Sequence, residues 1–257
     1  MMLVGPKEEA TPAASALQAP VCLSLYVACY NEQDNIIGTL ETLVSALKKT
    51  VPSYDIIIVD DASRDESVPR ILKYMEENPG LPLRLLLNPQ NEGVANNYAE
   101  ASFRAKGQWY RMICGDNVEP AETLEKIFSA IGQAEILVPY HFEVHGRSLF
   151  RRSISKIYTA LVNLISGYRL HYYNGLLLTR TDYARRWHSN SHGFGFQADL
   201  LTRLLSKNLS FLEIAVSGNE RVTGHSKALT FRNLASVAHS LQNVLIRSVS
   251  KLLYGQC

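Results

Sequence analysis

The sequence lacks the motifs of several common enzyme classes. Its only four cysteines form no C-x-x-C pair, which argues against a zinc site and favours a reducing compartment; they are Cys22, Cys29, Cys114 and Cys257. It contains no Gly-x-Ser-x-Gly, no Walker loop and no Gly-x-Gly-x-x-Gly, which excludes the hydrolase elbow, the P-loop and the dinucleotide fingerprint. No apolar run approaches the ~20 residues that span a bilayer. A net charge of +2 is too small to predict a nucleic-acid partner.

The first 20 residues differ in composition from the rest of the chain. Residues 1–20 are rich in Ala and Pro and lack an apolar stretch, so we expect a disordered tail and not a signal peptide. The whole chain of 257 residues is 46% hydrophobic and 19% charged, enough for one large core. These properties favour a cytoplasmic protein.

Two acids follow an apolar run in the first third of the chain. Residues 56–59 (Ile-Ile-Ile-Val) are all β-branched, which predicts a strand buried on both faces of a parallel sheet. Asp60 and Asp61 come next, at the carboxyl end of the strand, where ligands of such sheets bind. The alternative is an Asx-type turn that only caps the following helix.

A similar unit comes directly before this one. Residues 21–27 predict a strand, and a polar loop follows it. An apolar stripe over 36–47 then predicts a helix capped by Asn31 or Asp34. A second helix is predicted over 67–78. Two consecutive strand–loop–helix units predict the beginning of a βαβ sheet.

The polar residues at the ends of these two strands resemble a known family. A strand ending in Tyr30-Asn31-Glu32, followed by a strand ending in Asp60-Asp61-x-Ser63, is similar to the family 2 glycosyltransferases. The resemblance covers roughly residues 21–230. It implies an α/β protein of the GT-A type, with a Rossmann-like, mostly parallel central sheet flanked by helices. It further implies a set of residues that bind a nucleotide sugar: Ala28, Tyr30, Glu32, Asp60, Asp61, Asn91, Gly115, Asp116 and Lys227.

The next two predicted strands cover 83–87 and 109–113. The first leads to Asn91-x-Gly93, which resembles the family loop that precedes a donor-site helix, here 94–105; an ordinary Gly turn is the alternative. The second ends in Cys114-Gly115-Asp116, where the family has Asp-x-Asp. In the family, those carboxylates hold a divalent cation against the donor diphosphate.

Cys114 therefore stands where the family has its first metal ligand. A thiol is a poor ligand for Mg²⁺. Binding of Mg²⁺ or Mn²⁺ would then depend on Asp116 and the diphosphate oxygens, with Asn117 or Glu119 as further candidates. Both weaker metal binding and an inactive site remain open.

Two basic motifs follow in the second half. Arg151 and Ser155 share one face of a helix that continues to Gly167. Residues 221–227 read Arg-x-x-Gly-x-Ser-Lys. Both motifs resemble the polyprenyl-phosphate branch of the family, which includes dolichyl-phosphate mannose synthases. The resemblance implies that Arg151, Ser155 and Ser226 orient an acceptor phosphate, and that Arg221 and Lys227 stabilise the charge of the donor phosphates. A solvated basic helix face is the alternative for Arg151.

The segment from Gly193 to Leu200 also resembles this branch and is expected to open a helix. Its Gln197 and Asp199 fall where the family places residues near the reacting centre. A hydroxyl acceptor needs a general base, whereas a phosphate monoester, with a second pKa near ~6, does not. Asp199 is thus a candidate base or only a helix-start residue. With Asp116 and Arg221, it completes the candidate catalytic set.

The last segment, 229–257, is predicted to be an amphipathic helix over about 229–253. Three uses are open: it covers the core, lies on an anionic membrane surface, or pairs with another subunit in a homo-oligomer. The predicted organisation is therefore a disordered tail over 1–20, a GT-A domain over 21–228 and a C-terminal helical extension.

The predicted function is inverting transfer of a sugar from a nucleotide diphosphate sugar to a polyprenyl phosphate of the dolichyl or undecaprenyl type. The enzyme would be cytoplasmic and peripheral on the inner face of the membrane. One alternative is a family member acting on a sugar hydroxyl of a glycan or glycolipid, with Asp199 as base. Another is a non-catalytic protein that binds nucleotide sugars through a degraded metal site. The donor base and sugar stay open.

Overall fold

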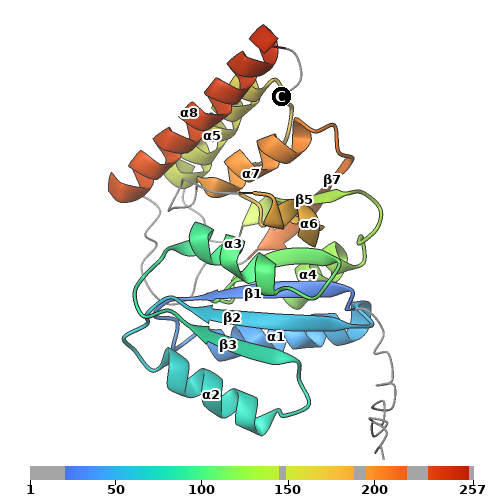
Figure 1. Cartoon of the computed structure of the whole chain (residues 1–257), viewed down its shortest axis with the longest axis vertical. Coiled ribbons are helices and arrows are strands. Elements are labelled where there is room, and N and C mark those ends of the chain that lie inside the picture. The colour runs from blue at the N-terminus through green and yellow to red at the C-terminus, as the bar shows by residue number, and fades with distance from the viewer. Residues whose placement is uncertain (1–20, 145–148, 188–194, 219–230, 255–257) are drawn as a thin grey trace, which may run out of the picture.

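Four parallel strands form the first half of the central sheet. The computed structural model describes residues 21–144, 149–187, 195–218 and 231–254 (Figure 1). The four strands are adjacent in the order β3-β2-β1-β4, with bounds β1 Leu23–Cys29, β2 Tyr54–Asp60, β3 Leu83–Leu87 and β4 Trp109–Cys114. The predicted strands at 21–27, 56–59, 83–87 and 109–113 correspond to them. Three helices connect them: α1 Ile36–Thr50, α2 Ser67–Glu77 and α3 Val94–Arg104.

The second half of the sheet is mixed. The strand order continues from β4 through β6 (Leu178–Arg180) and β5 (Ile136–Val144) to β7 (Phe211–Gly218). The short β6 is antiparallel to both of its neighbours, whereas β5 and β7 are parallel. The sheet is therefore mostly parallel, as predicted, with one reversed strand near its centre.

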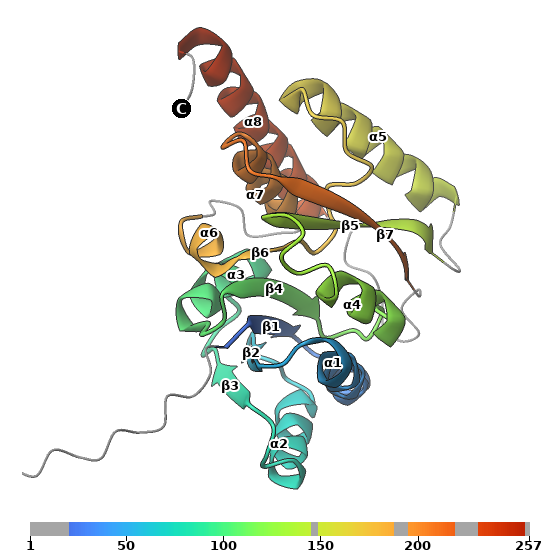
Figure 2. The same cartoon turned by 90° about the vertical axis from the view of Figure 1, so that its right-hand side faces the viewer.

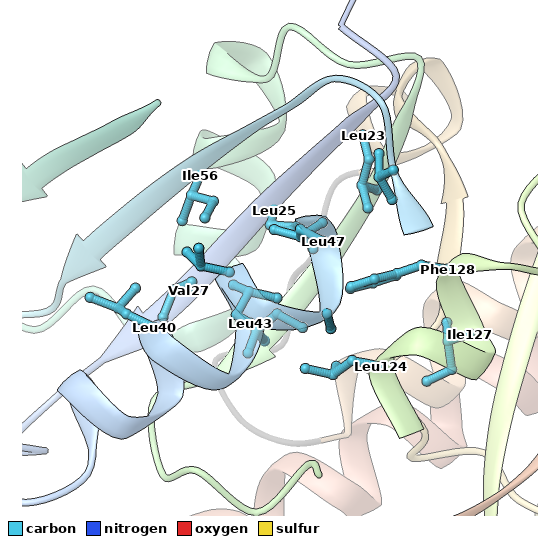
Figure 3. Packing of buried hydrophobic residues seen from close by; sticks show 14 of the residues in the cluster. Leu23, Leu25, Val27, Leu40, Leu43, Leu47, Ile56, Leu124, Ile127 and Phe128 are labelled. Carbon is cyan, nitrogen blue, oxygen red and sulfur yellow. The ribbon is translucent and has the colours of Figure 1, made fainter. Parts of the chain in front are cut away.

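One face of the sheet is covered by α1, α2 and α4 (Ala121–Phe128). The leucines of α1 recur at intervals of three and four residues and point at β1 and β2, as Figure 3 shows for Leu40, Leu43 and Leu47. Phe128 of α4 packs into the same cluster. Burial of each such side chain contributes about 1.5–3 kcal/mol, so this layer fixes α1 and the loop before it.

The other face is covered by α3, α6 (Thr181–Arg185) and α7 (Phe196–Leu205). An aromatic cluster joins them to the sheet: Tyr98 lies 5.0 Å from Tyr110, 5.8 Å from Trp187 and 5.4 Å from Phe196 between ring centroids. Beyond α7 lie two long helices, α5 (Leu149–Ser166) and α8 (Phe231–Tyr254), at one end of the molecule (Figures 1 and 2).

The start of α1 differs from the prediction. The residue before the helix is Asn35, which makes no side-chain capping hydrogen bond, and neither Asn31 nor Asp34 caps the helix. Asn31 instead has a left-handed backbone (φ 55°) and holds the neighbouring loop. The predicted tail 1–20 lies outside the described residues. Among the described helices, none combines the length and apolarity that crossing a bilayer requires.

Candidate functional site

The ends of β1, β2 and β4 meet at one edge of the sheet. Cys29 at the end of β1 pairs with Asp60 of β2, and Ala28 pairs with Cys114 of β4. The polar residues that follow each strand are therefore brought together. This is the edge at which ligands of parallel sheets bind.

Asp61 organises the loop after β3. Its Oδ1 accepts hydrogen bonds from Asn88 Nδ2 (2.9 Å) and the Glu92 amide (2.8 Å), and its Oδ2 accepts one from the Gly93 amide (3.0 Å). Asn91 Nδ2 donates to the Asp61 carbonyl oxygen at 3.1 Å. The predicted Asn-x-Gly loop is thus held beside Asp61, and Gly93 supplies a positive φ of 86° at the start of α3.

Asp60 presents an unused oxygen. The carboxylate is buried; its Oδ2 accepts a hydrogen bond from the Ser63 amide at 2.9 Å, while Oδ1 has no partner in the described part of the chain. A buried carboxylate oxygen without a partner is costly unless a ligand donates to it. The arrangement fits a ligand that donates a hydrogen bond from a hydroxyl or an N–H group. Burial, with a contribution from Asp60, also raises the pKa of the Cys29 thiol to about 12.

The loops after β1 and β2 are tied to each other. The Asn31 amide donates to Ser63 Oγ (2.9 Å), and the Arg64 amide donates to Asn31 Oδ1 (2.8 Å). The Glu32 amide donates to Ser67 Oγ at 2.9 Å, and Glu32 Oε2 accepts from Asn35 Nδ2 at the same distance. These bonds fix the backbone around Tyr30 in one conformation.

Gly115 lies against β1. Its amide donates to the carbonyl oxygen of Ala28 at 2.9 Å, and a Cβ added there would lie only 2.6 Å from that oxygen. A side chain at this position would push β4 away from β1. Asp116, the next residue, is half-buried in the turn that follows.

The side chains near Asp116 contact other parts of the protein. Burial raises the pKa of Cys114 well above its usual value, and nearby Asp116 and Glu119 raise it further, so the thiol stays neutral. Asn117 Oδ1 accepts a hydrogen bond from Thr42 Oγ1 of α1 at 3.3 Å. Asn117 and Glu119 thus each have a partner among the described residues, and their role as further metal ligands stays a prediction.

Glu119 forms a bidentate ion pair with Arg111. Arg111 Nη2 lies 2.5 Å from Glu119 Oε1 and Nη1 lies 3.1 Å from Oε2, while Nε donates to the Leu176 carbonyl oxygen at 3.0 Å. The Arg111 side chain, on β4, is fully buried. The pair anchors the turn that carries Asp116 to the centre of the sheet. An arginine inside an otherwise apolar strand is visible in the sequence, but the sequence does not show that Glu119 is its partner.

Asp116 is the carboxylate that the strand-end motif offers to a metal ion. Within the described residues, no three His, Cys, Asp or Glu side chains are grouped to hold a metal ion. One carboxylate together with substrate phosphates is a donor set that Mg²⁺ accepts, because this ion keeps several waters. The described residues thus fit an ion bound together with a substrate diphosphate.

Asp199 is bound on both sides. Its Oδ1 forms an ion pair with Arg247 of α8, and its Oδ2 accepts a hydrogen bond from Trp187 Nε1 at 3.2 Å. Arg247 also donates from Nη1 to Thr202 Oγ1 at 2.9 Å. We name this group of four side chains the α7–α8 clamp. It favours a structural role for Asp199, which as a base would need a carboxylate oxygen facing substrate.

The neighbouring Gln197 holds a loop. With its amide oriented as its surroundings require, the nitrogen donates to the carbonyl oxygens of Asn174 (2.7 Å) and Gly175 (3.2 Å). Gly175 itself leaves no room for a side chain, because an added Cβ would lie 1.9 Å from the Pro139 carbonyl oxygen. The start of α7 is thus fixed to the chain that enters β6.

The basic motifs are only partly described. Arg151 lies at the beginning of α5 and Ser155, one turn later, is half-buried, as the predicted helix requires. The loop with Arg221, Ser226 and Lys227 lies outside the described residues. Sequence reasoning missed Trp187 and Arg247, whose role depends on contacts between distant segments.

Comparisons with known sequences support the resemblance. The family model described as "Glycosyl transferase family 2" matches residues 24–203. An undecaprenyl-phosphate 4-deoxy-4-formamido-L-arabinose transferase of Photorhabdus laumondii subsp. laumondii is 24% identical over 231 residues, covering 90% of this chain and 70% of the relative. A transferase of the same name from Edwardsiella ictaluri is 24% identical over 205 residues; the match covers 80% of this chain and 62% of that relative.

Solved structures share the fold. A mannosyltransferase from Pyrobaculum calidifontis, in complex with GDP-Man and Mn²⁺, superposes with a TM-score of 0.64 at 15% identity, covering 95% of this chain and 74% of the other. Glucosyl-3-phosphoglycerate synthase from Mycobacterium tuberculosis, with Mn²⁺, UDP-Glc and phosphoglyceric acid, gives 0.62 at 14% identity, covering 86% and 80%. Both are glycosyltransferases crystallised with a divalent metal. The family model covers well over half of the chain, so this protein is a glycosyltransferase and belongs to glycosyl transferase family 2.

Proposed function

We propose that this glycosyltransferase moves a sugar from a nucleotide diphosphate sugar to a polyprenyl phosphate, with inversion at the anomeric carbon. The observation that carries the proposal is the 24% identity, over 90% of the chain, to a transferase named for an undecaprenyl-phosphate acceptor. The strand-end geometry supports the donor half of the reaction. The Arg151 and Ser155 face of α5 supports the acceptor half.

The donor would bind across the ends of β1, β2 and β4. Asp60 offers a buried, unused oxygen to the nucleoside, and Asp61 fixes the loop of Asn91 on one side. The ordered loop of Tyr30 and Glu32 encloses the other side. These contacts orient the donor and hold the leaving diphosphate beside the turn of Asp116.

The diphosphate must leave as a stabilised anion. Asp116 is the residue that would hold a divalent cation, which supplies positive charge to the diphosphate when bound. The Arg111–Glu119 pair holds the Asp116 turn in position, so little reorganisation is needed as charge develops. Arg221 and Lys227 are the cationic residues that we assign to the donor phosphates.

A phosphate acceptor does not require a general base for its attack on the sugar. The acceptor is already largely anionic at neutral pH, so it needs orientation and not deprotonation. The α7–α8 clamp occupies both oxygens of Asp199, which agrees with this acceptor class. Arg151, Ser155 and Ser226 would orient the acceptor phosphate opposite the leaving group, and this geometry inverts the anomeric centre. The acceptor is a lipid, so we place the reaction at a membrane surface.

The test combines the purified protein with a polyprenyl phosphate in detergent, a panel of UDP- and GDP-sugars, and Mg²⁺ or Mn²⁺. Mass spectrometry of the lipid fraction should show a lipid–phosphate–sugar product with one donor, and chelation of the metal should suppress it. Asp116→Ala is the inactive control. Donor turnover onto free or glycan sugars, with none onto the lipid phosphate, would reject the proposed acceptor class.

A further inference from the structure

Two helices at one end of the molecule turn apolar side chains outward. On α5, Ile154, Ile157, Leu161 and Leu164 recur at intervals of three and four residues, and all four are exposed. The opposite side of α5 faces the protein, where Val162 is buried. A helix of a globular protein normally buries such a stripe. Here the stripe faces solvent, which indicates an interaction surface.

The end of α8 continues this surface. Leu245, Val249 and Leu252 follow the same spacing and are exposed, whereas Ser240 and Val244 on the other side are buried. An apolar groove of about 390 Å³ lies between the helices, lined by Leu164 and Ile165 of α5 and by the exposed α8 residues. The two helices lie side by side in both views (Figures 1 and 2). We name this surface the α5–α8 face.

The charge on the two helices has one sign. Neither α5, with 18 residues, nor α8, with 24, contains a single Asp or Glu, although the chain carries 24 acids. Arg152 and Lys156 on α5 and Lys251 on α8 are exposed. Helices that carry outward apolar side chains and exposed cations, but no acids, are complementary to an anionic lipid surface: the apolar groups enter the interface and the cations meet the headgroups.

A second copy of the chain fits the same face less well. A twofold interface places the same patch on both partners, so cations would face cations with no acid from either helix to pair with them. From these observations we propose that the α5–α8 face docks on an anionic phospholipid bilayer, with its apolar side chains in the interfacial layer.

The proposal deepens the proposed function and rests on it for its purpose. A lipid acceptor has its phosphate at the headgroup level, and α5 also carries Arg151 and Ser155 near its beginning. Docking through α5 and α8 would bring the site that binds the acceptor phosphate to the bilayer surface. The docking itself is measurable without any sugar transfer.

The experiment is flotation of the full chain with vesicles of phosphatidylcholine alone and with added phosphatidylglycerol. We expect binding to the anionic vesicles that weakens as salt is raised. The test variant is Leu164→Glu/Leu252→Glu, at positions 81% and 87% exposed. It should bind on the order of a hundredfold more weakly, because two leucines no longer enter the interface. The matched control is Leu72→Glu/Phe103→Glu, on α2 and on the last turn of α3, which adds the same charge at exposed apolar positions of 47% and 55% and should bind as the wild type does.

Each result decides between explanations. Equal binding of both double variants, or no binding of the wild type to anionic vesicles, overturns the proposal. A wild-type dimer in light scattering that dissociates only in the Leu164→Glu/Leu252→Glu variant overturns it as well, and assigns the face to self-association. Transfer to a short-chain polyprenyl phosphate in detergent is assayed in parallel. Vesicle binding without transfer would reject the proposed function and leave the docking surface in place.

Discussion

The contacts of Asp199 lead to a prediction that separates a base from a structural anchor. The variants are Asp199→Asn, Arg247→Met and the double substitution. Asparagine keeps an oxygen for Trp187 Nε1 but loses the charge, and methionine keeps most of the Arg247 stem. If Asp199 holds α8 to α7, the three variants share one defect. If it is a base, only the variants at position 199 are inactive.

The expected stability loss follows from the burial of the pair. Removing one partner of a buried ion pair costs about 3–5 kcal/mol. The Arg247 side chain is 22% exposed and that of Asp199 is 9% exposed, so water compensates part of this for either variant. We expect Arg247→Met to lose about 2–3 kcal/mol of unfolding free energy, which lowers Tm by roughly 5–10 °C in a chain of this size. The double variant should lose little more than the worse single variant, a coupling of at least about 1 kcal/mol.

The assay is sugar transfer measured well below the lowest Tm, alongside denaturant unfolding of all four proteins. For a structural anchor, kcat should fall less than about tenfold in each variant, and Asp199→Asn and Arg247→Met should resemble each other. For a general base, Asp199→Asn should lose about 10²–10⁴-fold in kcat while Arg247→Met stays active. That second pattern, with additive stability losses, would refute the clamp.

Three further predictions concern the strand-end site. Asp116→Ala should reduce transfer more than about a hundredfold with an unchanged Tm, since it removes the metal ligand we assign; wild-type rates would rule out that role. Cys114→Asp should bind Mn²⁺ at least about tenfold more tightly in titration calorimetry, because it adds a second hard ligand; unchanged affinity would contradict the assigned site. The Cys29 thiol has its pKa raised to about 12, so the folded state keeps a proton that the unfolded chain releases near pH 9, and stability should fall as pH rises from 9 towards 12. Urea unfolding should show a shallower fall for Cys29→Ala, and equal slopes would contradict the burial of the thiol.

The first half of the fold is readable from the sequence because each of its elements is local. The β-branched run before Asp60 and the leucine spacing of α1 each determine one element, and successive units place the strands side by side. The second half depends on distant contacts. The three-residue β6 has too little pattern to be recognised as a reversed strand, and its direction follows from its pairing with β4 and β5.

The candidate site is likewise predictable only in part from the local sequence. Residue types at strand ends predict which side chains gather, because strand ends of a parallel sheet share one edge. They do not predict which of these acids already accept hydrogen bonds or form ion pairs within the protein. Asp61, Glu119 and Asp199 are each bound to groups from other segments, and only the three-dimensional arrangement distinguishes them from Asp60, whose Oδ1 has no partner among the described residues.

The α7–α8 clamp also connects the proposed docking surface to the start of α7. Arg247 belongs to α8, whose outward side forms part of the α5–α8 face, and its partner Asp199 lies in the first turn of α7. Two residues before it, Gln197 fixes the loop of Asn174. The Arg247 contacts to Asp199 and Thr202 would therefore connect a docked α8 to the start of α7. Arg247→Met should then weaken the dependence of transfer rate on anionic lipid while leaving vesicle binding unchanged, since none of the substituted atoms lies on the docking surface.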